Sequence, residues 1–287
     1  MKIINPSVEI IKQEPGYDGM IRHIERCGRT CYKSADRITE NSAERFVNML
    51  KESGHLSVLE HGAIYLQMQY SKIAYEAFDY NHYSKVSSIE DAGSMFVSTN
   101  YRVIVENGLE DLLKYMVKPG PMHDLRVTAK FSTQIAISRE FNRHRVNSPS
   151  EESTRYVNYN KERFGKQIRI NLPTWIADDG NFEADFDDMC EEIKRDEQNG
   201  WNVLDWWWFA NVFCEKAYIE LIRLGWKPQQ ARTILPLDTN TELVHSAFIS
   251  DWKHFFELRC DNVHAHPDAY YIASELQKQF VENGYIK

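Results

Sequence analysis

LRVTAKFSTQIAISREFNRHR, residues 125–145, is the stretch that decides the fold. Over 125–132, apolar side chains alternate with polar ones, and this period of two predicts a strand with one face toward a core. QIAISREFNRHR, residues 134–145, then predicts a short helix that would place Arg139 and Arg143 one turn apart on the same face. The stretch therefore predicts a strand that leads through a helix into a cluster of arginines.

Strand patterns dominate the first half of the chain and helical patterns dominate the second. AIYLQMQYSK (63–72) alternates with a period of two, SMFVSTNYRVIVENG (94–108) offers a further strand, and 18–54 has helical spacing. Three more helical segments are predicted in the final third, at 201–226, 239–260 and 267–280. This separation favours an α+β fold over alternating βαβ units.

The composition is that of a globular protein, with 43% of the 287 residues hydrophobic and 26% charged. No apolar run approaches the roughly 18 residues of a membrane span, and the mean hydropathy is −0.54. The start, MKIINPSVEIIKQEPGYDG, lacks the basic and apolar regions of a secretion signal. Five cysteines without a C-x-x-C pair indicate unpaired thiols in a reducing, cytoplasmic setting.

A formal net charge of −8 argues against nucleic acid as the main partner, because duplex binding normally leaves a basic face. RHRVNSPSEESTRY (143–156) is nevertheless locally basic, which suggests a small anionic ligand. Its arginines offer planar forks for phosphate or carboxylate. Glu151 and Glu152 would orient these arginines or accept hydrogen bonds from a ribose or a base. Ser153 lacks the G-x-S-x-G surroundings of a nucleophile, so phosphate binding suits it better.

Other segments have ordinary structural interpretations. HLSVLEH (55–61) matches no standard zinc spacing, so His55 and His61 are expected to be structural or to face a ligand. DWWWF (205–209) cannot form one stacking platform, because consecutive helical residues point in different directions. Packing in the core or at a subunit interface is the better interpretation. The acidic stretch 178–197 is expected to form a loop and a solvated helix.

Several motifs together resemble one family. RHR followed by seven residues and Ser153, and then by Arg155-Tyr156, resembles the signature of the flavin-dependent thymidylate synthases. HLSVLEHG (55–62), ARTILPL (231–237) and HFFELR (254–259) occur in the order that this family shows. The resemblance covers about residues 20–275 and implies one domain over 1–287, with an antiparallel sheet surrounded by helices and a helix-rich C-terminal third.

The resemblance also implies an activity, namely a methyltransferase that forms dTMP from dUMP without a cysteine nucleophile. Methylenetetrahydrofolate would be the carbon donor, NADPH the reductant and FAD the redox carrier. The resemblance further implies a homotetramer with shared active sites and the small-molecule substrates dUMP and folate. From the acidic charge and the lack of a long apolar run we expect neither a nucleic acid nor a membrane partner.

Residue roles follow from the same resemblance. The implied FAD contacts are His61, Arg143, His144, Arg145, Glu151 and His254. The implied dUMP contacts are Glu140, Arg143, Glu151, Ser153, Arg155, Arg232 and Arg259. Arg259 would be catalytic, because a guanidinium beside the pyrimidine stabilises its ionised form.

Two residues depart from the family's pattern. Ser150 stands where asparagine is common, and Glu140 stands where glutamine is common. Stretches 72–124 and 160–200 are expected to be family-variable insertions. The alternative from another class is a nucleotide- or RNA-binding module that uses the Arg143–Arg155 cluster. A metal-dependent hydrolase using His55, His61, His264 and His266 is a third hypothesis.

Overall fold

The structure, a computed structural model, describes residues 1–89, 93–176 and 186–287. Its strands are β1 (Lys2–Ile4), β2 (Ser7–Ile11), β3 (Ala63–Gln69), β4 (Lys85–Ile89), β5 (Ser94–Asn100), β6 (Arg126–Gln134), β7 (Ser148–Glu151), β8 (Arg169–Asn171) and β9 (Asn240–Phe248). Its α-helices are α1 (Gly16–Cys31), α2 (Ser42–Glu52), α3 (Lys72–Asp79), α4 (Tyr101–Glu106), α5 (Ile135–Phe141), α6 (Phe186–Lys194), α7 (Val203–Arg223), α8 (Pro228–Ala231), α9 (Ile249–Arg259) and α10 (Pro267–Glu282).

The strands form two antiparallel sheets and one short parallel pair. The larger sheet has the order β2-β6-β9-β7, and the smaller has the order β3-β5-β4. β1 pairs with β8 in the parallel sense. The predicted α+β class with an antiparallel sheet is therefore confirmed.

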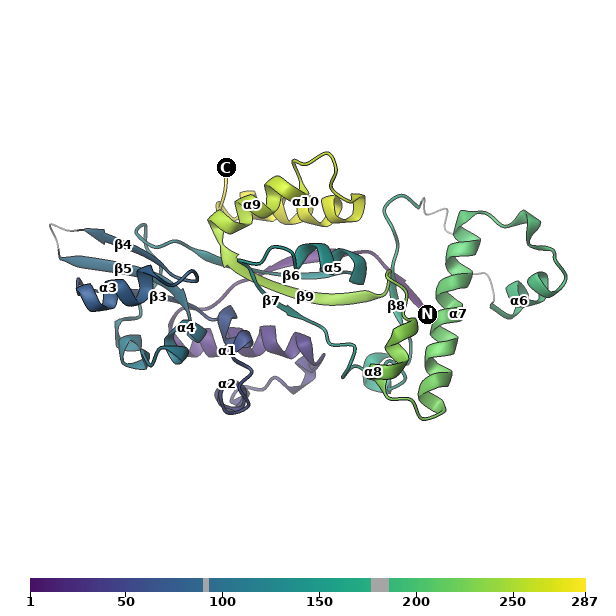
Figure 1. Ribbon diagram of the computed structural model, residues 1–287, viewed down its shortest axis with the longest axis horizontal. Helices are drawn as coiled ribbons and strands as arrows, with labels where there is room; N and C mark the ends of the chain where they lie inside the picture. The colour runs from purple at the N-terminus through teal and green to yellow at the C-terminus, as the bar shows by residue number, and fades with distance from the viewer. Residues whose placement is uncertain (90–92, 177–185) are drawn as a thin grey trace.

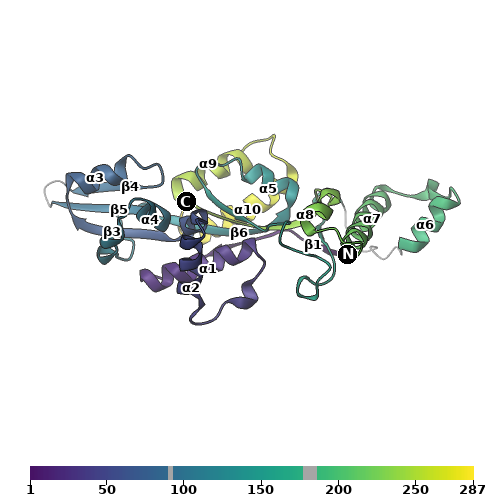
Figure 2. The ribbon, with the colours of Figure 1, turned by 60° about the horizontal axis from the view of Figure 1, so that its bottom comes forward.

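Helices cover both faces of the larger sheet. Figure 1 shows α9 and α10 above β6 and β9, and α1 and α2 below them. The smaller sheet, with α3 and α4, lies at one end of the elongated molecule, and α6 and α7 lie at the other (Figures 1 and 2). None of the helices in the described ranges is both long enough and apolar enough to cross a membrane.

β6 follows the alternation predicted for 125–132. Val127, Ala129 and Phe131 are buried in a core shared with α9 and α10. The helix predicted over 134–145 forms, but α5 ends at Phe141 and the chain turns before the arginines. Of the acidic stretch 178–197, the solvated helix is confirmed as α6, whereas residues 177–185 lie outside the described residues.

β9 corrects the helix predicted over 239–260. Residues Asn240–Phe248 form a strand between β6 and β7, and only Ile249–Arg259 is helical. Leu243, Val244, Ala247 and Phe248 are all buried, because helices cover both faces of this central strand. A strand buried on both sides loses the polar alternation that would have distinguished it from a helix.

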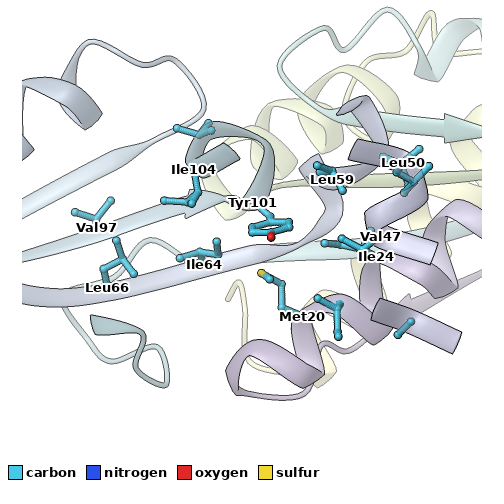
Figure 3. Close-up of a cluster of buried hydrophobic side chains, with 14 of the residues drawn as sticks. Met20, Ile24, Val47, Leu50, Leu59, Ile64, Leu66, Val97, Tyr101 and Ile104 are labelled. Carbon is cyan, nitrogen blue, oxygen red and sulfur yellow. The ribbon is translucent and has the colours of Figure 1, made fainter. Parts of the chain in front are cut away.

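The end of η2 (Leu56–His61) packs closely against α1. Figure 3 shows Met20 and Ile24 of α1 beside Leu59 and Ile64, in the core shared by α1, α2, β3 and β5. Gly62 lies at this contact. A Cβ atom there would lie 2.6 Å from Ile24 Cδ1 and 2.9 Å from Met20 Cγ. The close approach of the chain to α1 therefore requires glycine.

We expect Gly62→Ala to destabilise the protein by about 1–3 kcal/mol, because the added methyl group overpacks a filled core. Gly120→Ala is the matched control, since no atom lies within 4 Å of a Cβ at Gly120. Its free energy of unfolding should change by no more than about 0.5 kcal/mol. Urea denaturation of both variants measures the difference. Equal stabilities would show that the contact at Gly62 is loose.

Candidate functional site

β7 brings the SEESTRY segment to the edge of the larger sheet. Its four residues pair with β9, from Ser148 opposite Ser246 to Glu151 opposite Leu243. Pro149 is tolerated because β7 is an edge strand with one side free of ladder hydrogen bonds. The chain leaves the sheet after Glu151, so the following residues project beyond the strand.

Glu151 is held by three uncharged donors. Ser138 Oγ donates to Oε1 at 2.7 Å, Thr241 Oγ1 donates to Oε1 at 3.2 Å, and Asn142 Nδ2 donates to Oε2 at 3.0 Å. These donors come from α5, from the turn after it and from β9. The carboxylate is thus fixed in direction, and no ion pair to it forms among the described residues, which suits an acceptor for a ligand.

A cavity of about 560 Å³, here called the β7 cleft, opens beside Glu151. Its walls come from the end of α1, the loop before η2, the segment after β7, and Arg232 in η7 (Arg232–Ile234). Four predicted substrate contacts line it, namely Glu151, Ser153, Arg155 and Arg232. Arg232 is distant in the sequence from the other three residues, and the fold brings it into the same cleft.

The cations of the β7 cleft remain accessible. Arg232 is exposed, and its Nη1 donates to Thr154 Oγ1 at 3.1 Å. Arg155 is also exposed, with its guanidinium carbon 5.2 Å from the centre of the Tyr156 ring. Neither forms an ion pair with a carboxylate in the described part of the chain. Two such guanidinium groups facing one cleft can bind an anion such as phosphate.

Arg259, at the end of α9, is the centre of a second group of predicted residues, here called the Arg259 cluster. Its Nη1 donates to Glu140 Oε2 at 2.7 Å, and its Nη2 donates to the Glu140 carbonyl at 2.7 Å. Its Nε donates to His144 Nε2 at 3.2 Å. All three nitrogen atoms of the Arg259 guanidinium therefore donate a hydrogen bond, and the carboxylate of Glu140 offsets its positive charge.

His144 is the buried member of the Arg259 cluster. Its ring lies 4.8 Å from Phe255 and 6.2 Å from His254, measured between ring centres. Burial, followed by the charges of Arg259 and His254, lowers the pKa of His144 to about 4. A neutral ring that accepts from Arg259 at Nε2 must carry its proton at Nδ1.

Asn142 joins the two groups. It donates to Glu151 of the β7 cleft, and its Oδ1 lies 3.2 Å from His245 Nε2 behind the Arg259 cluster. Arg143 and Arg145 follow it and are exposed, without an ion pair among the described residues. The RHR segment thus contributes His144 to the Arg259 cluster and leaves its two arginines exposed.

His61 does not line the β7 cleft and is not hydrogen-bonded to the Arg259 cluster. It is 1% exposed, and its two ring nitrogens each lie 2.8 Å from a serine hydroxyl, those of Ser246 and Ser150. Burial holds the pKa of His61 well below its ordinary value. Its predicted contact with FAD remains a prediction.

The metal-hydrolase hypothesis gains no support from the geometry. His55 lines the β7 cleft, where its Nδ1 lies 3.3 Å from the Tyr32 hydroxyl. His264 and His266 lie before and at the start of α10. Within residues 1–89, 93–176 and 186–287, no three His, Cys, Asp or Glu side chains are grouped so that they could hold a metal ion.

Sequence reasoning missed the residues that orient Glu151. Ser138, Asn142 and Thr241 are common polar residues, and Thr241 is 90 residues away along the chain. Asn142 directly precedes the RHR motif, so its position offered a weak signal. Tyr32, which also lines the β7 cleft, offered none.

Comparison with known proteins identifies relatives. The family model described as thymidylate synthase complementing protein matches residues 72–283. A flavin-dependent thymidylate synthase from Thermosipho melanesiensis is 28% identical over 163 residues, which cover 56% of this chain and 66% of that protein. One from Synechocystis sp. is 28% identical over 159 residues, covering 52% and 65%. The match spans about two thirds of the length of these relatives.

Among solved structures, a UMP/dUMP methylase, PolB, from Streptomyces cacaoi, bound with 5-Br dUMP, is similar with a TM-score of 0.42 and 16% identity. The superposition covers 98% of this chain and 93% of that one. The same protein bound with 5-Br UMP has a TM-score of 0.42 and 15% identity.

We expect stability to fall as the pH drops from about 6.5 toward 4, in part because of His245. Burial lowers the pKa of His245 to about 3. Below pH 6.5 this histidine therefore binds a proton in the unfolded chain but stays neutral in the folded chain, which favours unfolding. The contribution of neutral His245 to the free energy of unfolding is complete above pH 6.5, and about 2 kcal/mol of this contribution is lost by pH 5.

Urea denaturation at pH 7.5 and pH 5 measures this effect. His245→Gln should reduce the difference between the two pH values, because glutamine takes up no proton. His82→Gln, at an exposed position, should leave it unchanged. The prediction would be contradicted if the free energy of unfolding changed as much between pH 7.5 and pH 5 in His245→Gln as in the unmodified protein.

Proposed function

Because this chain belongs to the thymidylate synthase complementing protein family, we propose that it is an enzyme that forms dTMP from dUMP. Methylenetetrahydrofolate would supply the carbon and NADPH the reducing equivalents, with FAD as the bound redox cofactor. Residues 1–287 would act as a single domain, and the five unpaired cysteines favour a cytoplasmic location.

The proposal rests on one observation: the β7 cleft is lined both by accessible arginines and by a carboxylate, Glu151, whose direction is fixed by hydrogen bonds. A nucleotide presents a phosphate at one end and hydrogen-bond donors on its sugar and base at the other. Arg155 and Arg232 offer accessible guanidinium groups for the phosphate, and Ser153 adds a hydroxyl. Glu151, held by neutral donors, would accept from the sugar or the base.

The exposed arginines of the RHR segment suit a dinucleotide cofactor. Arg143 and Arg145 are exposed without an ion pair among the described residues, so they can bind the diphosphate of FAD. When bound, FAD supplies hydride chemistry that no side chain can perform. The protein's own residues would hold it against the RHR segment, next to Glu151.

Arg259 would act on the pyrimidine ring. A guanidinium in a site shielded from water stabilises an ionised base, which is more reactive toward carbon transfer. In the structure Arg259 already forms an ion pair with Glu140, in which Oε2 of Glu140 lies 2.7 Å from Nη1 of Arg259. The substrate would therefore displace or share this carboxylate, and Glu140 would set how much positive charge the base experiences.

A homotetramer with shared sites is part of the proposal. α7 carries exposed apolar side chains on its surface, among them Val203, Trp206 and Phe213. Exposed apolar groups along a helix of 21 residues indicate a surface that packs against another chain. Association through α7 would also give the tryptophans of DWWWF the interface role predicted for them.

The purified protein should be yellow, with flavin absorbance that bleaches on addition of NADPH and recovers in air. Arg143→Ala should lose most of the FAD while keeping its fold, because it removes a phosphate-binding cation. Arg139→Ala, an exposed arginine one turn earlier, is the matched control and should retain FAD. An absorption spectrum with protein and flavin quantified measures this. A colourless protein that binds RNA with a steep salt dependence would instead support the binding-module hypothesis.

We expect Arg259→Ala to lower turnover at saturating dUMP by about 100-fold or more, because it removes the charge that stabilises the ionised base. The matched control is Arg45→Ala, since Arg45 is exposed on α2 and has no role in the proposed site. Rates of dTMP formation by chromatography provide the measurement. Near-normal turnover in Arg259→Ala would rule out the assigned role.

A further inference from the structure

A chain of buried hydrogen bonds crosses the larger sheet. Four consecutive contacts form it, two of 2.8 Å on either side of an imidazole, one of 2.6 Å and one of 3.0 Å. In order, the chain runs from Ser150 Oγ to His61 Nε2, from His61 Nδ1 to Ser246 Oγ, on to Thr128 Oγ1, and finally to His23 Nε2.

The strand register creates this chain. Thr128 of β6 lies directly opposite Ser246 of β9, and cross-strand hydroxyl pairs at such positions bond to each other. His23 approaches from α1, and His61 from the end of η2. Each of the five members is at most 6% exposed, so the hydrogen bonds between them are shielded from bulk water.

The chain has two proton arrangements that satisfy every member. In one, each hydroxyl donates toward His23, and His61 carries its proton on Nδ1. In the other, each donates toward Ser150, and His61 carries its proton on Nε2. Both use each hydroxyl proton once, because a neutral imidazole donates at one nitrogen and accepts at the other. Switching between them moves one proton along the whole chain.

The two ends of this chain of hydrogen bonds lie at different cavities. At one end, Ser150 neighbours Cys31, which lines the β7 cleft, and its hydroxyl favours the thiolate form of Cys31. At the other, His23 lines a separate cavity of about 290 Å³ that is also bounded by the exposed residues Lys12 and Glu14. The hydrogen-bond chain therefore runs across the strands on one face of the sheet, from the β7 cleft to a separate cavity beside β2 and β6.

We propose that Cys31, Ser150, His61, Ser246, Thr128 and His23 form a proton relay that carries a proton out of the β7 cleft. This rests on the proposed function, in which a carbon replaces the hydrogen at C5 of the pyrimidine. When that C–H bond breaks, its electron pair stays with the ring. As the proton reaches Cys31 Sγ, the thiol passes its own S–H proton to Ser150 in the same step. Each following member hands its own proton to the next, and His23 accepts one at Nε2 and releases the proton of Nδ1 into its cavity.

The protonation states of the two histidines suit this role. Burial keeps the pKa of His61 well below its ordinary value and lowers the pKa of His23 to about 4. Both rings are therefore neutral near pH 7, as a relay that donates and accepts requires. A histidine with so low a pKa also gives up an extra proton readily.

Histidine nitrogen NMR tests the relay without substrate. In the unmodified protein we expect the two ring nitrogens of His61 to show averaged shifts, because its tautomers exchange. Thr128→Val removes one hydroxyl at nearly constant volume and leaves Ser246 free to donate to His61 Nδ1. The shifts should then move to those of the tautomer protonated at Nε2.

Thr99→Val is the matched control, since Thr99 is equally buried and its hydroxyl lies 2.8 Å from that of Ser84. It should leave the His61 shifts unchanged, and Thr128→Ser should restore the averaging. A single His61 tautomer in the unmodified protein, or unchanged shifts in Thr128→Val, would overturn the relay.

Release of tritium from dUMP labelled at C5 tests proton transfer during turnover. Thr128→Val should slow release about 10- to 100-fold with an unchanged KM for dUMP, and Thr128→Ser should recover it. Equal release in Thr128→Val and the unmodified protein would overturn the catalytic role. Absence of both release and dTMP in the unmodified protein would refute the proposed function instead, while the NMR result still decides whether the relay exists.

Discussion

The antiparallel pairing of β6 with β9 is the interaction on which the rest of the molecule depends. It joins residues 126–134 to residues 240–248 in one continuous register. α5 and the RHR segment continue from β6, α9 and Arg259 continue from β9, and β7 adds Glu151 along the free side of β9. The proposed relay also passes through this pairing, at Thr128 and Ser246. A shift of one residue would turn these side chains to the opposite face.

The sequence predicted one strand of this pair and missed the other. β6 has a polar side toward α1 and an apolar side toward α10, so its alternation is visible. β9 is buried on both sides, and its Leu243, Val244, Ala247 and Phe248 also fit the spacing of a helix. Only the long-range pairing with β6 decides between the two, and this information is not present in a local window of sequence.

The candidate site shows a similar limit. The fold places some of the residues predicted from the resemblance in the β7 cleft, some in the Arg259 cluster, and His61, Arg143 and Arg145 in neither, and their assigned roles remain predictions. Glu151 and Glu152 are adjacent and chemically identical, yet successive side chains of an extended chain point to opposite sides. Glu151 meets neutral donors beside the cleft, whereas Glu152 is buried with Lys33 Nζ at 3.1 Å. Their environments depend on partners that are distant in sequence, so composition alone could not separate them.

The central claim is that the cations and the fixed carboxylate of the β7 cleft serve the conversion of dUMP to dTMP. Its most direct test is incubation of the purified, FAD-loaded protein with dUMP, methylenetetrahydrofolate and NADPH, followed by mass-spectrometric detection of the nucleotide product. We predict dTMP, formed only when all three compounds are present. Unchanged dUMP after incubation with folded protein that retains its flavin would contradict the claim.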